Sequence, residues 1–102
     1  MTRSLDTHTI VWRGVTIEIR YEERWLGSDG PFSTAHLELH VLSPDKAPLP
    51  VTDTGYRSHF TPASVIAEAG GPVAFVRAWL DHEAGSKAWK EKEAAARQMT
   101  LF

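Results

Sequence analysis

The chain has 102 residues, no cysteine and a formal net charge of −2. This length suits one soluble domain with a modest core, and the lack of cysteine excludes a disulfide scaffold, a cysteine-ligated metal site and a cysteine nucleophile. The near-neutral charge argues against direct nucleic-acid binding, because such proteins usually carry a basic excess. No apolar run approaches the ~20 residues that cross a bilayer, so we expect a cytoplasmic protein with no membrane partner.

The first elements of the chain predict a β-hairpin. Apolar and polar residues alternate over 15–21, which is typical of a strand with one buried face. Arg13-Gly14 separates this run from an apolar run before it and fits a two-residue turn. The turn would place two pairs on one face of the hairpin: Trp12 opposite Val15, and Ile10 opposite Ile17.

Two further strands are predicted at 34–42 and 56–60. The segment 43–55 between them contains three of the six prolines, which indicates an extended loop. Within 34–42 every second residue from Leu37 is apolar, so this strand should also bury one face. The strand at 56–60 is short and is expected at the edge of the sheet.

Three potential metal ligands, His36, Glu38 and His40, share the polar face of the strand at 34–42. Alternate residues on a strand lie roughly 6.5–7 Å apart, so a metal site would need a further ligand from another strand. The simpler interpretation is a solvated sheet face to which Glu18 and Arg20 contribute complementary charges. We therefore expect no metal ion and no other cofactor.

The segment around the fourth strand is dense in functional side chains. An enzyme here would use His59 as a base and Ser58 or Tyr56 as its partner, but adjacent strand residues point to opposite faces and would not pair. We therefore expect a strand in which Tyr56 and Phe60 pack inward while Arg57 and His59 face water. A separate alternative is a loop built on Tyr56, Arg57 and His59 that forms a contact surface for a protein or a nucleic acid.

Helices are predicted after residue 60. Thr61 is expected as the N-cap of a helix at 63–69, with proline at its first position and Gly70 at its end. A second helix, beginning at Gly71-Pro72, has apolar residues at helical spacing and should cover the sheet. A third, capped by Ser86 at its start, is rich in strong helix formers and should be held by Trp89.

These elements predict one α+β domain at 1–97. It would be an antiparallel meander of three or four strands within 8–60, followed by two or three C-terminal helices within 62–97 packed on one face. A helix-turn-helix over 62–84 is a weaker alternative, because the free face of its second helix offers one arginine and one aspartate. Residues 98–102 would form an exposed linear motif.

The sequence at 98–102, QMTLF, is the most specific motif in the chain. It resembles the sliding-clamp binding pentapeptide of bacterial replication and repair proteins, whose usual form is Gln-Leu-(Ser or Asp)-Leu-Phe. The two differences, Met for Leu and Thr for Ser, conserve volume and the hydroxyl group. The resemblance implies that Gln98 is the polar anchor, that Met99 makes a flexible apolar contact and that Thr100 is a spacer. Leu101 and Phe102 would together fill an apolar pocket of the clamp. The rest of the chain resembles small bacterial or mobile-element proteins without an assigned activity.

Two functions follow as hypotheses, and neither is enzymatic. The first is an adaptor that binds the bacterial sliding clamp through 98–102 and is linked to DNA replication or repair. The alternative is an inhibitor or accessory protein of a plasmid or phage that binds a second protein through the sheet edge and the 56–60 segment. Two further interpretations are a tail that folds back onto the domain, and a small hydrolase or metal-dependent enzyme that uses His36, His40 or His59.

Overall fold

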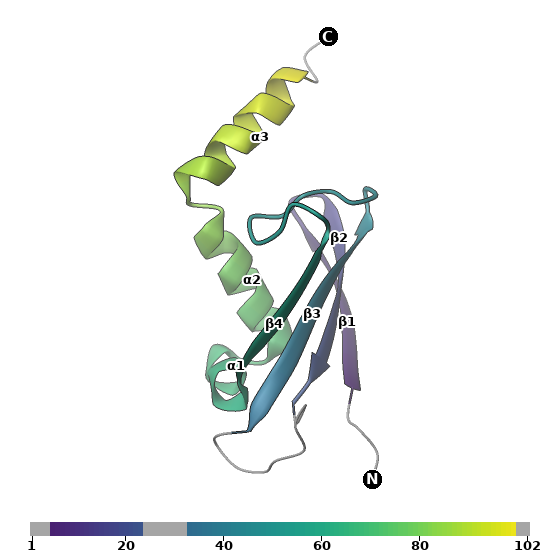
Figure 1. The fold of residues 1–102 in the computed structure, drawn as a ribbon, viewed down its shortest axis with the longest axis vertical. Coiled ribbons are helices and arrows are strands. Elements are labelled where there is room, and N and C mark those ends of the chain that lie inside the picture. The colour runs from purple at the N-terminus through teal and green to yellow at the C-terminus, as the bar shows by residue number, and fades with distance from the viewer. Residues whose placement is uncertain (1–4, 24–32, 100–102) are drawn as a thin grey trace.

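The computed structural model describes residues 5–23 and 33–99, with side chains up to residue 95. Within these residues it confirms the α+β prediction, with four antiparallel strands in one sheet followed by three helices (Figure 1). None of the described helices is long and apolar enough to cross a membrane. The elements are β1 (Leu5–Trp12), β2 (Val15–Glu22), β3 (Thr34–Ser43), β4 (Tyr56–Pro62), α1 (Ala63–Ala69), α2 (Pro72–Glu83) and α3 (Lys87–Met99).

The sheet is a meander of order β1-β2-β3-β4, which places β4 at an edge as predicted. The β1–β2 hairpin has the predicted register, with Trp12 opposite Val15. Both turn residues have positive φ, 47° at Arg13 and 81° at Gly14, which suits a two-residue connection between twisted strands. The turn chemistry and the apolar alternation therefore agree, and together they set the register.

The core lies between one face of the sheet and the helices. Val76 and Leu80 of α2 are fully buried against strand residues such as Ile19 and Leu37. At the rim of this core, the Trp12 indole N–H donates a hydrogen bond to Asp81 at 2.9 Å. Figure 1 shows the described helices on one side of the sheet, so the opposite face carries no described helix.

The start of α1 differs from the prediction that Thr61 caps it. Thr61 instead pairs with Ala35 in the β3–β4 ladder, and α1 begins at Ala63 without a side-chain cap. Strand pairing continues to the helix, because the Ala63 N–H donates to the Ser33 carbonyl at 2.8 Å. The end of α1 is as predicted, since Gly70 takes the left-handed conformation at φ 103°.

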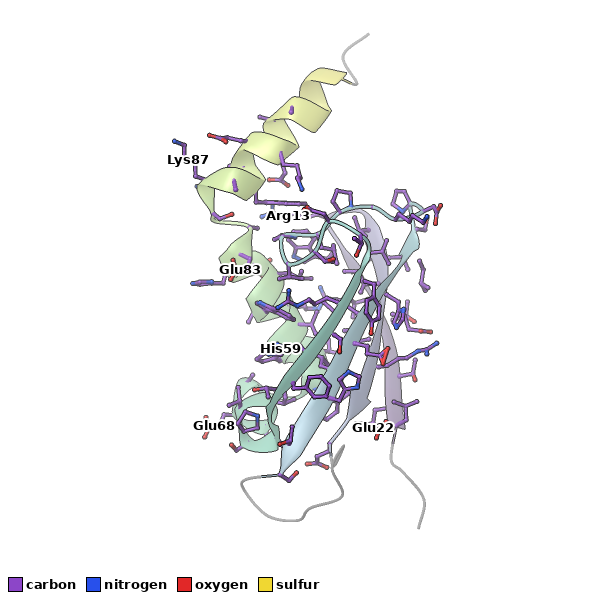
Figure 2. The ribbon with its side chains drawn as sticks, viewed as in Figure 1. Arg13, Glu22, His59, Glu68, Glu83 and Lys87 are labelled. Atoms are coloured by element: carbon purple, nitrogen blue, oxygen red, sulfur yellow. The ribbon has the colours of Figure 1, made fainter. Side chains whose placement is uncertain are left out.

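Helix α3 is attached to the body near its start. The Ser86 hydroxyl accepts a hydrogen bond from the Trp89 N–H at 3.1 Å, which confirms the predicted cap. The Trp89 ring is buried against Trp12, with ring centres 6.2 Å apart. Glu93 accepts a hydrogen bond from Arg13 at 2.9 Å, and Arg13 lies close to α3 in Figure 2. Beyond these contacts α3 extends away from the sheet (Figure 1).

Candidate protein-contact surface around strand β4

The face of the sheet opposite the helices is organised in rows that run from β1 to β4. Directly opposite residues in neighbouring strands share a face, so the pairing registers define each row. We call the three central rows the open face. They consist of Thr9, Glu18, His40 and Tyr56; of Thr7, Arg20, Glu38 and Ser58; and of Leu5, Glu22, His36 and Phe60.

Two aromatic side chains lie on the open face, and the prediction that they pack inward is wrong. Tyr56 and Phe60 are 45% and 51% exposed. Tyr56 lies edge-on to His40 with ring centres 4.9 Å apart, and Phe60 stacks on His36 at 4.5 Å. The physical reason is the register, because each aromatic residue is opposite one of these histidines and must share its face.

Arg57 and His59 lie on the other side of β4, toward the helices. Arg57 is exposed, as predicted, whereas His59 is partly buried. The His59 ring is 4.8 Å from the Trp79 ring, and the Arg57 guanidinium is 5.6 Å from the same indole (His59 is labelled in Figure 2). Burial lowers the pKa of His59, and the positive charge of Arg57 lowers it further. The predicted contact surface of Tyr56, Arg57 and His59 is therefore divided between two faces.

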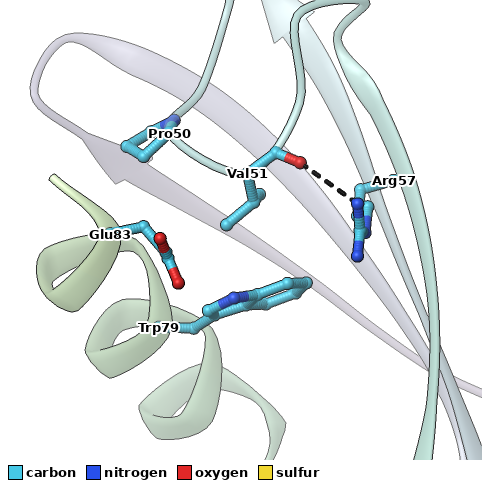
Figure 3. Close-up of a pocket in the computed structure, with 5 residues that line it drawn as sticks. All are labelled: Pro50, Val51, Arg57, Trp79 and Glu83. Atoms are coloured by element: carbon cyan, nitrogen blue, oxygen red, sulfur yellow. Dashed lines mark hydrogen bonds between the residues drawn. The ribbon is translucent and has the colours of Figure 1, made fainter. Parts of the chain in front are cut away.

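A small recess opens beside Arg57, between β4, α2 and the loop that precedes β4 (Figure 3). Its volume is about 240 Å³, and Trp79 and Glu83 of α2 form one side. The Arg57 guanidinium donates a long hydrogen bond, 3.5 Å, to the Val51 carbonyl across it. The sequence carries no signal that singles out Glu83, because only the fold brings α2 next to β4. The recess presents both charges and suits a polar side chain of a partner.

The three potential metal ligands on β3 bind other protein groups. His36 Nε2 is 2.7 Å from the Ser58 hydroxyl, and His40 Nε2 is 2.9 Å from Glu38 Oε1. Among the described residues, no group of three histidine, aspartate or glutamate side chains could hold a metal ion. Hydrogen bonds between neighbouring side chains account for the arrangement of these residues.

The pairing of Ser58 with His36 raises the question of nucleophilic catalysis. Ser58, His36 and Glu38 lie in the order of a catalytic triad. However, His36 Nδ1 is 3.8 Å from Glu38 Oε2, which is beyond hydrogen-bond distance. Glu38 is instead bonded to His40. As predicted, Ser58 does not pair with His59, which lies on the opposite side of the strand. The arrangement favours a binding surface over an acyl-transfer site.

The clamp-like motif lies at the limit of the described residues. The helix α3 continues past the expected end at Arg97, so Gln98 and Met99 are its last two residues. Thr100, Leu101 and Phe102 lie outside the described residues. The assignment of 98–102 as a clamp-binding segment stays a prediction.

Comparison with known proteins identifies a family. A family model described as the KlcB third domain matches residues 5–89. This span includes the sheet, α1, α2 and the start of α3 as far as the buried Trp89, while 90–102 lie beyond it. No curated protein and no solved structure gave a match. Because the matched span covers most of the chain, the protein belongs to the KlcB third-domain family.

Proposed function

We propose that the protein is a non-enzymatic accessory protein of a plasmid or another mobile element, and that it binds a second protein through the open face and β4. Membership of the KlcB third-domain family supports the association with mobile elements. The observation that carries the binding role is the exposure of Tyr56 and Phe60 on a sheet face that no described helix covers.

The chemistry of these two side chains suits an interface. Tyrosine and phenylalanine are enriched where proteins meet, since each offers a large contact area with few rotatable bonds. Each ring also packs against an imidazole of β3, which restricts its motion before binding and lowers the entropy lost on association. A partner at this edge of the sheet could also reach the recess beside Arg57 on the far side of the same strand.

Affinity capture from host-cell extract tests this proposal. The bait proteins are the wild type, the Tyr56→Ala/Phe60→Ala double variant and Val65→Ala, in which an exposed apolar residue of α1 is truncated. We expect the wild type and Val65→Ala to retain one dominant protein that the double variant loses. Equal recovery by all three baits would contradict the proposal, provided circular dichroism shows that each variant is folded.

We propose clamp binding as a second function, carried by a separate segment. The described contacts that hold α3 come from its first two turns, at Trp89, Lys92 and Glu93, and its far end is directed away from the sheet (Figure 1). Such an arrangement would present Gln98 and the residues after it to a partner without blocking the open face. An affinity in the micromolar range, about −8 kcal/mol, is expected for such a short segment.

A binding measurement with purified bacterial sliding clamp separates the two functions. We expect Leu101→Ala/Phe102→Ala to abolish clamp binding, because the resemblance assigns these side chains to the apolar pocket. The Tyr56→Ala/Phe60→Ala variant should bind the clamp as the wild type does. If the wild type does not bind, or if the tail variant binds equally well, the clamp proposal is wrong and the accessory role of β4 is unaffected.

A further inference from the structure

The open face has an unbalanced charge. Its three rows carry three carboxylates, Glu18, Glu22 and Glu38, and one guanidinium, Arg20. The excess of two carboxylates on this face equals the net charge of −2 of the whole chain. Phosphate groups would be repelled here, whereas lysine and arginine side chains would be attracted.

Glu18 and Glu38 are each held in position by a neighbouring side chain. Glu18 accepts a hydrogen bond from Arg20 Nε at 2.8 Å, and Glu38 Oε1 is 2.9 Å from His40 Nε2. Both carboxylates are partly exposed, with about a quarter of each side chain accessible. A carboxylate offers roughly four acceptor sites, so each of them retains capacity for a charged donor from a partner.

An aromatic ring lies beside this acidic centre. Tyr56 is in the same row as Glu18, separated from it by His40, and the residue is 45% exposed. Aromatic faces attract guanidinium and ammonium groups and also pack against apolar side chains. The open face therefore combines acceptors for positive charge with an apolar margin along β4.

We propose that the open face docks a segment of a protein partner that carries arginine or lysine residues next to apolar ones. The basic groups would lie against Glu18 and Glu38, and the apolar side chains would pack on Tyr56. This inference rests on the proposed accessory function and specifies the chemistry of the partner. The segment is a peptide rather than a nucleic acid, because the carboxylates would oppose a phosphate backbone.

Fluorescence anisotropy with defined probes tests the inference. The probe is a labelled peptide that alternates arginine with leucine, and the comparison probes are its glutamate counterpart and a single-stranded oligonucleotide. The proteins are the wild type, Glu38→Gln, Tyr56→Ala and Glu68→Gln. Glu68 is an exposed residue of α1 (Figure 2), so its variant makes the same charge change away from the open face.

We expect the arginine peptide to bind the wild type and Glu68→Gln alike, and to bind Glu38→Gln and Tyr56→Ala about fivefold or more weakly. Equal weakening by both glutamine variants would overturn the inference, because general charge attraction would explain it. Tighter binding of the glutamate peptide or the oligonucleotide would also overturn it. If the peptide result is negative while the capture experiment still retains a partner through Tyr56 and Phe60, the partner chemistry is wrong and the proposed function stands.

Discussion

The two faces of the sheet differ in what their side chains do. On the helix-covered face, Ile17, Ile19 and Leu37 are completely buried and hold the sheet to α2. On the open face, the residues of the same strands are polar or aromatic apart from Leu5, and they are partly or fully exposed. If the open face is the docking surface that we propose, stability and recognition depend on opposite sides of the same strands, and substitutions should separate the two properties.

Strand β4 lies at the edge of the sheet, where a partner could reach side chains on both faces. Its alternate residues send Arg57 and His59 toward Trp79 on one side and Tyr56 and Phe60 outward on the other. An edge strand has one paired neighbour, and its side chains are accessible from both sides. A partner bound at this edge could therefore contact both sets of residues.

The largest expected effect is the loss of a core side chain. Leu37→Ala should lower the free energy of unfolding by about 2–5 kcal/mol, because the residue is fully buried and its removal leaves a cavity. Tyr56→Ala on the open face should lower it by about 1 kcal/mol or less, since the ring is half exposed and loses mainly its packing on His40. Urea denaturation measures both. Equal losses of unfolding free energy in the two variants would contradict this difference between the faces.

A second substitution tests how α3 is attached to the helix-covered side of the sheet. Trp89→Ala should lower the free energy of unfolding by about 3 kcal/mol, because the buried indole packs against Trp12. It should also lower the helical signal in circular dichroism, since α3 loses its main apolar attachment. The matched control is Lys90→Ala, an exposed neighbour on the same helix. If both variants keep full helicity, α3 is stable without its attachment and the prediction fails.

The smallest expected effect is a pH dependence of stability that comes from His59, on the side of β4 toward the helices. Burial lowers the pKa of His59 in the folded protein, so protonation favours the unfolded chain. Stability should therefore be complete above the ordinary pKa of 6.5 and should fall as the pH drops below it. His59→Gln removes this dependence. Urea denaturation across this pH range should show the wild type losing more stability than the variant, and parallel curves would contradict the prediction.

Local signals in the sequence were sufficient for much of the fold. The alternation at 15–21 and the Arg13-Gly14 turn gave the hairpin with its register, and Ser86 and Trp89 gave the start and attachment of α3. These predictions succeeded because each depends on residues close together in the chain or on a single large apolar side chain.

The orientation of β4 could not be derived in this way. Both sets of its alternate residues can be buried or exposed, and the choice depends on pairing with His40 of β3 and on Trp79 of α2, which are distant in sequence. The predicted cap of α1 was wrong for a related reason, because the pairing of Thr61 with Ala35 overrides a local helix-start signal. The recess beside Glu83 likewise exists only once α2 lies next to β4.

An NMR titration with the arginine–leucine peptide tests the central claim most directly. The backbone amide shifts of the labelled protein would be followed as the peptide is added. If the open face is the docking surface, the changes should concentrate at the rows that contain Glu18, Glu38 and Tyr56, while α1 and the far end of α3 stay unchanged. Changes confined to the helices, or no changes on the sheet, would contradict the account.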